Sequence, residues 1–138
     1  MKTMPRYLVA KYVADPKRTE PVNIGVVVWA NGHTAMRFLG SDESVALVND
    51  VKDYNRRLEH WGNVLSKDSI ETGNRGDIAK KSPDFIDAFS DTRKGNYILA
   101  DGGEILDKVI ARNVKDAAEY LYEELVARKG THAPTPRD

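Results

Sequence analysis

Two apolar segments near the N-terminus carry the hydrophobic pattern of β-strands. Residues 7–13 are apolar at most positions, and residues 22–29 are rich in valine with few polar positions. Runs without polar alternation are typical of strands that are buried on both faces. Asn31-Gly32 then gives the strongest short-range signal for a hairpin turn, because both residues tolerate positive φ. We therefore predict that residues 33–39 fold back and pair with residues 25–29.

Two further segments carry the three- and four-residue spacing of amphipathic helices. In the first, residues 47–65, we expect Ser41 or Asp42 to act as the N-cap. Its apolar stripe consists of Leu47, Val48, Val51, Tyr54, Leu58, Trp61 and Leu65. The second helix is expected over residues 114–126, with Asn113 as its N-cap.

The remaining segments predict shorter elements. Ser82-Pro83 is typical of a helix start, so a short helix is expected over residues 83–90. Residues 66–76 are polar and contain glycine, which predicts an exposed loop. Residues 96–100 predict a strand, and Asp101-Gly102 predicts a turn that leads into residues 104–106.

Together these elements predict an α+β fold. We expect a mainly antiparallel sheet of about four or five strands, packed by two amphipathic helices. A chain of 138 residues has room for one domain, which we place over residues 1–130. Residues 131–138 contain two prolines and almost no apolar content, so we predict a disordered tail.

The amino-acid composition disfavours some classes of binding partner and of functional site. Lys+Arg and Asp+Glu both number 21, so the net charge is +0, and no overall positive field favours nucleic acid or an anionic membrane. The chain has no cysteine, which excludes a disulfide, a thiolate nucleophile and a cysteine-based zinc site. No segment approaches the ~20 apolar residues of a membrane span. These observations predict a cytoplasmic protein with no membrane partner.

A polar cluster connects the two N-terminal strands and is the first candidate binding site. It contains Asp15, Arg18, Glu20 and Asn23. Such a cluster can grip a polar ligand or a partner protein. It can equally be structural, with Arg18 and Glu20 paired and the Asn23 side chain bonded to backbone groups.

Other candidate chemistry is weaker. No two of the three histidines have a metal-binding spacing, so we predict no metal site, and no motif indicates a cofactor. The segment 72–77 lacks the lysine of a phosphate-binding loop. Three basic pairs, Arg56-Arg57, Lys80-Lys81 and Arg93-Lys94, could contact nucleic acid if they converged, with Trp61 or Tyr54 stacking a base. Basic pairs are more often solvated surface, so nucleic acid is possible but not favoured.

Gly25 lies inside the second predicted strand. A glycine at such a position marks a bulge or a close approach by another backbone. With Asn23 it could shape a small notch. We favour a packing contact against the helix predicted over residues 47–65.

The N-terminal residues also resemble a known family. Asp15-Pro16, Arg18, Glu20 and residues 22–27, preceded by Tyr12-Val13, are similar to the opening motif of the uncharacterised bacterial domain-of-unknown-function family 3037. The closing helix, with Asp116, Leu121 and Leu125-Val126, resembles the C-terminus of that family. The resemblance covers the first third and the last quarter of the chain. It implies an α+β fold in a bacterial or phage protein, and a neighbouring kinase that resembles the HipA toxin. It implies no catalytic activity.

These observations predict a small accessory or protein-partner-binding module, in a bacterial toxin–antitoxin or phage-defence setting. A kinase similar to HipA is the expected partner, and Asp15, Arg18, Glu20 and Asn23 are the expected binding residues. The alternative is a metal-dependent enzyme that processes nucleic acid, with Asp15 and Glu20 as oxygen ligands and Lys11 or Lys17 near the phosphate. The sequence does not decide whether the protein is an enzyme.

Overall fold

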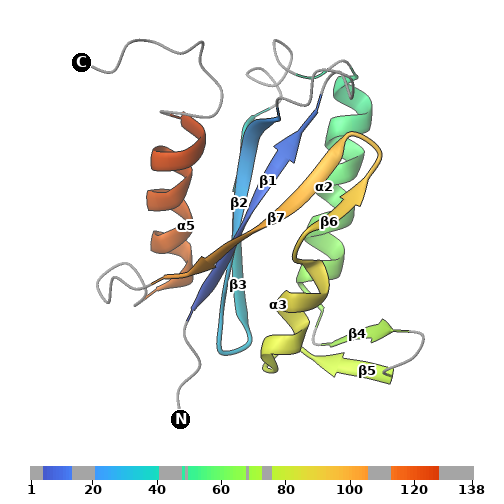
Figure 1. Cartoon of the computed structure of the whole chain (residues 1–138), viewed down its shortest axis with the longest axis vertical. Helices are drawn as coiled ribbons and strands as arrows, with labels where there is room; N and C mark the ends of the chain where they lie inside the picture. The colour runs from blue at the N-terminus through green and yellow to red at the C-terminus, as the bar shows by residue number, and fades with distance from the viewer. Residues whose placement is uncertain are drawn as a thin grey trace.

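An antiparallel sheet of five strands forms the centre of the protein (Figure 1). The computed structural model describes residues 5–13, 21–40, 48, 50–67, 69–72, 76–105 and 113–127. The strands lie in the order β3-β2-β1-β7-β6. They are β1 (Arg6–Tyr12), β2 (Val22–Ala30), β3 (His33–Phe38), β6 (Thr92–Lys94) and β7 (Tyr97–Glu104). The predicted α+β fold with an antiparallel sheet is confirmed.

The β2–β3 hairpin follows its turn residues. Asn31 and Gly32 have φ angles of 51° and 87°, as both positions of a type I′ turn require. The strands pair from Ala30 with His33 to Gly25 with Phe38. Both apolar N-terminal segments lie inside the sheet, since β1 and β2 each have a strand on either side. The prediction of this hairpin is therefore confirmed.

Helices cover both faces of the sheet. They are α2 (Val51–Leu65), α3 (Pro83–Phe89) and α5 (Val114–Tyr122), and α5 continues into the π-helical turn η1 (Glu123–Ala127). Arg37 on β3 contacts Tyr122 of α5, whereas the next residue, Phe38, stacks on Trp61 of α2. Because successive side chains of a strand point to opposite faces, α5 and α2 lie on opposite sides of the sheet (Figure 1). The short helix α3 lies on the α2 side, where Asp87 reaches Arg6.

Three N-caps define where the helices begin. Ser82 and Asn113 accept hydrogen bonds from the first turns of α3 and α5, as predicted. The predicted start of the first long helix is wrong. Its cap is Asp50, whose side chain accepts from the backbone N–H of Asp53, so neither Ser41 nor Asp42 caps it. The buried Val48 belongs to the apolar stripe but precedes the helix, because a residue in contact with the core need not be helical.

The predicted loop over residues 66–76 is wrong as well. Strands β4 (Ser69–Thr72) and β5 (Gly76–Ala79) form a separate two-stranded antiparallel sheet. Each strand has four residues and a single isoleucine, and the two isoleucines pair. A strand of four residues is too short to show the alternation of apolar and polar positions by which a strand is predicted. Ile78 is buried, and β5 contacts α3.

The predicted turn at Asp101-Gly102 is a β-bulge inside β7. Tyr7 pairs with Gly103 and Leu8 pairs with Asp101, so Gly102 is the extra residue. A side chain at Gly102 would collide with the Tyr7 ring. Gly103 has a φ of 98°, and its N–H donates to the Asp101 carboxylate at 2.9 Å. The turn-forming residues therefore serve to bend a strand that continues to Glu104. Strand β6, which the sequence pattern missed, joins β7 through a turn at Gly95-Asn96.

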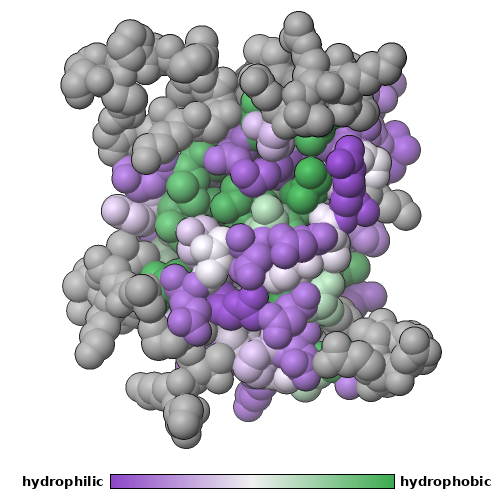
Figure 2. Space-filling model, viewed as in Figure 1, coloured by the Kyte–Doolittle hydropathy of each residue, from purple (hydrophilic) through white to green (hydrophobic). Residues whose placement is uncertain are grey.

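The core lies on both faces of the sheet, and two of its buried polar side chains, Trp29 and Tyr54, donate to backbone carbonyls. The Trp29 indole donates to the Lys80 carbonyl at 2.7 Å, and the Tyr54 hydroxyl donates to the Leu39 carbonyl at 2.7 Å. Apolar side chains reach the surface in the middle of the view in Figure 2, with hydrophilic residues around them. The predicted tail, residues 131–138, lies outside the described residues.

Candidate binding pocket

Of the four predicted binding residues, the structure describes Asn23. It lies on β2, half-buried, and its side-chain amide donates to the Leu125 carbonyl at 2.8 Å. This bond fastens η1 to the sheet, which is the structural alternative considered for this residue. Asp15, Arg18 and Glu20 lie outside the described residues, so the site that they would form stays a prediction.

Gly25 makes room for an aromatic ring from the neighbouring strand. Any Cβ at Gly25 would collide with the ring of Phe38 on β3. A bulge is also present beside it, because Ala10 pairs with Gly25 and Lys11 pairs with Asn23. The favoured packing contact with a helix is indirect: Phe38 fills the space and in turn stacks on Trp61 of α2, with ring centroids 5.7 Å apart.

A pocket of about 300 Å³ lies where α2 and α3 meet the β6–β7 edge of the sheet. We call it the Arg57 pocket. It is lined by Arg57, His60, Trp61, Val64, Ala88, Phe89, Thr92, Arg93 and Tyr97. Among the described residues, the lining combines basic and aromatic side chains and contains no carboxylate. Such a combination of apolar walls with a few polar groups is typical of ligand sites.

Arg57 carries a buried polar atom, its Nε, that has no hydrogen-bond partner. Its guanidinium carbon lies 6.0 Å from the ring centroids of both Trp61 and Tyr97. Its Nε is buried and has no hydrogen-bond partner, and no other buried side-chain nitrogen or oxygen in the described residues shares this state. A buried charged donor without an acceptor costs about 1–3 kcal/mol or more. The Nε has almost no accessible surface in this conformation, so a ligand oxygen would remove that cost once the Arg57 side chain turns its Nε toward the pocket.

Trp61 and Tyr97 form the closed, apolar part of the pocket. They are only 6% and 3% exposed, and their rings meet edge to face at 6.0 Å. Burial is the main cause that raises the pKa of Tyr97 to about 12, and the charge of Asp53 adds to it. Tyr97 is therefore a neutral phenol at physiological pH. It does not repel an anionic ligand.

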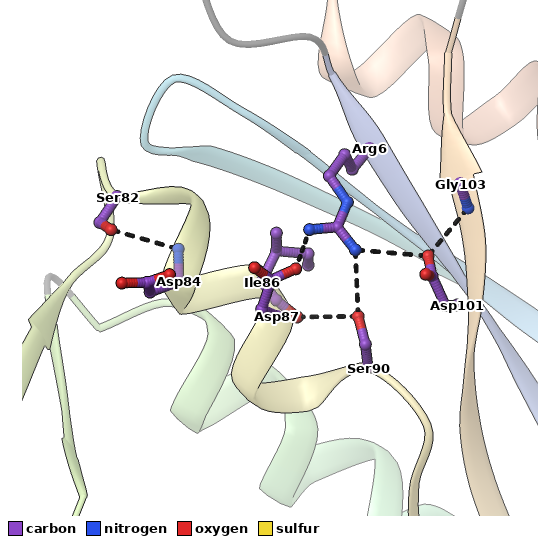
Figure 3. A network of polar contacts seen from close by, with 8 residues as sticks. All are labelled: Arg6, Ser82, Asp84, Ile86, Asp87, Ser90, Asp101 and Gly103. Atoms are coloured by element: carbon purple, nitrogen blue, oxygen red, sulfur yellow. Dashed lines mark hydrogen bonds and ion pairs between the residues drawn. The ribbon is translucent and has the colours of Figure 1, made fainter. Parts of the chain in front are cut away.

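The wall of the pocket formed by α3 is fastened to the sheet by Arg6 (Figure 3). The Arg6 guanidinium projects from β1 and bonds to Asp87 of α3. The Nη2 of Arg6 donates to the Ser90 hydroxyl and to the Asp101 carboxylate, each at 3.4 Å. The hydrogen bond to Asp87 is the largest cause of the raised pKa of Arg6. Because Ala88 and Phe89 follow Asp87 directly, this network holds one side of the pocket in place.

The basic pairs converge only in part. Arg57 on α2 and Arg93 on the edge strand β6 both line the pocket. Arg93 pairs with Ile98 across the sheet, and its Nε donates to the Gly95 carbonyl at 3.0 Å, so its guanidinium is already engaged. Lys81 lies instead against Gly32 of the β2–β3 turn.

Tyr54 cannot stack a base, because it is fully buried and bonded to Leu39. Sequence reasoning noted Arg57 and Trp61 but missed Phe89, Thr92 and Tyr97 as their neighbours. No local signal links residues 57–64 with residues 88–97.

The described residues contain no group of three or more histidine and acidic side chains placed to hold a metal ion. Among the helices in the described part of the chain, none has the length and apolar character needed to cross a membrane. Comparisons with protein-family models, curated proteins and solved structures found no match to this chain. The resemblance to family 3037 therefore stays a prediction that rests on the N-terminal and C-terminal residues quoted above.

Proposed function

We propose that this protein is a small recognition module that holds an anionic group of its ligand or partner in the Arg57 pocket. The observation that carries the proposal is the buried Nε of Arg57, which has no partner in a pocket with basic and aromatic lining. Buried polar groups in folded proteins are nearly always hydrogen-bonded, so an exception needs an explanation. Ligand binding supplies one.

The chemistry around Arg57 favours binding an anion. The lining residues that the structure describes include Arg57, His60 and Arg93 but no aspartate or glutamate. Asp53 lies one turn before Arg57 on α2, yet no ion pair joins them among the described contacts. An anion that enters the pocket meets the positive charges of Arg57 and Arg93, which the negative charge of Asp53 near Tyr97 offsets in part. Charge-assisted hydrogen bonds are about twice as strong as neutral ones.

This proposal keeps the partner-binding function expected from the sequence and adds a second surface to it. The accessory role beside a kinase, in toxin–antitoxin or phage defence, is supported only by the resemblance of the N-terminal and C-terminal residues to family 3037. The metal-dependent alternative requires Asp15 and Glu20, which lie outside the described residues. No observation on the described residues favours that alternative.

Arg56 and Arg57 provide a matched pair of variants for the test. Arg56 is exposed and does not line the pocket, whereas Arg57 does, so Arg56→Ala and Arg57→Ala remove the same charge from adjacent positions. We expect material that the wild-type chain captures from a lysate of its source organism to be retained by Arg56→Ala and lost by Arg57→Ala. Circular dichroism and urea unfolding of both variants show whether the fold is intact.

A third variant tests the rival surface. Charge reversal of Arg18 and Glu20 together leaves the described pocket unchanged in sequence. If capture survives Arg57→Ala but disappears on this reversal, the N-terminal connection is the binding site and the pocket proposal is wrong.

A further inference from the structure

We infer that the ligand of the Arg57 pocket is a nucleotide, meaning a nucleobase that carries at least one phosphate, either free or as a unit of a single strand. This inference rests on the proposed function, because it names the chemistry of the ligand held at the same site. It draws on the charge, the rings, the polar edge and the size of the pocket.

The basic residues of the pocket suit a phosphate. Arg57 and His60 are three positions apart on α2, so they lie on the same face of the helix, and both line the pocket. The guanidinium group provides several N–H donors in one plane, which match phosphate oxygens. The unpartnered Arg57 Nε is a donor of this kind.

The aromatic residues suit a base. Phe38 stacks on the Trp61 ring and Tyr97 meets that ring edge to face. Trp61 and Tyr97 are 6% and 3% exposed, so they form a fixed apolar floor, and the groups left to stack on a base are Phe89 and the Arg57 guanidinium. Phe89 is only partly buried and adds a flat wall from α3. Nucleobases stack on aromatic rings and on the plane of an arginine guanidinium. A carboxylate from a peptide would use Arg57 but leave these apolar surfaces without a contact.

Thr92 favours a nucleotide over a phosphorylated tyrosine, although both ligands combine a ring with a phosphate. The Thr92 hydroxyl donates its proton to the Phe89 carbonyl at 2.7 Å, so its oxygen can only accept a further hydrogen bond. A nucleobase carries N–H groups that can donate to it, whereas the ring of a phosphorylated tyrosine carries none. The volume of about 300 Å³ is at the small end of the range for ligand pockets. That size fits one nucleotide.

The two tryptophans provide reporters for the test. Trp61 lines the pocket, whereas the Trp29 indole is bonded to Lys80 and does not line it. The full-length chain is labelled with ¹⁵N and titrated with the four ribonucleoside 5′-monophosphates. Adenosine, inorganic phosphate and phosphotyrosine serve as comparison probes. We expect a nucleotide to shift the Trp61 indole resonance and to leave that of Trp29 in place.

The variants assign the binding to the pocket. Arg57→Ala should weaken nucleotide binding by about tenfold or more, as expected for one hydrogen bond to a charged group, and Arg56→Ala should bind as the wild type does. Short single-stranded RNA decides the source of the nucleotide. Tighter binding with a steeper dependence on salt indicates a strand, and equal affinity indicates a free nucleotide. Either result supports the inference.

Other outcomes overturn it. If inorganic phosphate or phosphotyrosine binds as tightly as the nucleotides, the pocket recognises an anion without a base; the proposed recognition function then stands and the nucleotide assignment falls. The same holds if no nucleotide shifts Trp61 while capture from lysate still depends on Arg57. If no probe shifts Trp61 and capture does not depend on Arg57, both proposals are wrong.

Discussion

Replacing Arg57 with methionine should not weaken the fold. If Arg57 is present for binding, its removal relieves a cost that the folded protein carries. The Arg57→Met variant keeps an unbranched side chain that covers part of the same apolar surface. It removes the guanidinium and, with it, the buried Nε that has no acceptor.

The magnitude follows from two opposing terms. Relief of an unsatisfied charged donor is worth about 1–3 kcal/mol. Against this stand two cation–π contacts with Trp61 and Tyr97 at 6.0 Å, the outer limit of the interaction, where each is worth no more than about 0.5–1 kcal/mol. We expect the free energy of unfolding to stay unchanged or to rise by about 1 kcal/mol, while ligand capture is lost.

Urea unfolding followed by circular dichroism measures this difference. Arg56→Met is the control, because an exposed substitution away from structural features changes stability by less than about 0.5 kcal/mol. A loss of 1 kcal/mol or more in Arg57→Met alone would show that Arg57 supports the fold, and the argument that it is kept for a ligand would fail.

Three further predictions concern the elements around the pocket. Gly25→Ala should destabilise the protein by about 1–3 kcal/mol through overpacking against Phe38. Adding Phe38→Leu to that variant should recover part of the loss. If urea unfolding shows that the losses of the two single variants simply add in the double variant, the collision between the added methyl group and the Phe38 ring is not the cause. Arg6→Gln should cost about 0.4–2 kcal/mol, since it removes two ion pairs that contribute about 0.2–1 kcal/mol each, with Asp87 and Asp101 49% and 39% exposed. A loss that does not shrink at high salt would contradict this origin. Tyr97 has a pKa of about 12 in the folded protein against ~10 in an unfolded chain, so its contribution to stability is complete below pH ~10 and is lost as the pH rises towards 12. In an ultraviolet titration, wild type and Tyr97→Phe should differ by one tyrosine that ionises near pH 12; the absence of this difference would refute the assignment.

The strands, helices and hairpin that could be predicted are those whose signals are local. The hairpin at Asn31-Gly32 depends on the φ preferences of two adjacent residues. The helices around Trp61 and Tyr122 depend on a spacing that recurs over several turns, and the caps Ser82 and Asn113 act within three residues. Each of these predicted elements is present in the fold because its tertiary contacts favour the same local structure.

Tertiary packing decided the features for which the same residues allow two local structures. Asp101-Gly102 suits either a turn or a bulge, and the Tyr7 ring packed over Gly102 selects the bulge. The stripe from Leu47 to Leu65 suits one long helix, but α2 begins only at Val51, after Asp50, which is extended and caps it. Strands β4, β5 and β6 have only three or four residues, so their partners define them more than their own pattern does.

Tertiary packing also decided the candidate pocket. Its basic and aromatic residues were visible in the sequence, yet residues 57–64 and 88–97 meet only because the sheet brings β6 and β7 beneath α2 and α3. Local spacing could not show that Arg57 lacks an acceptor, since the sequence around it offers acids at Asp53 and Glu59. Periodicity and turn chemistry thus determined the main strands and helices. Which polar groups remain unsatisfied was decided by the tertiary structure, because satisfaction depends on neighbours that are distant in the chain.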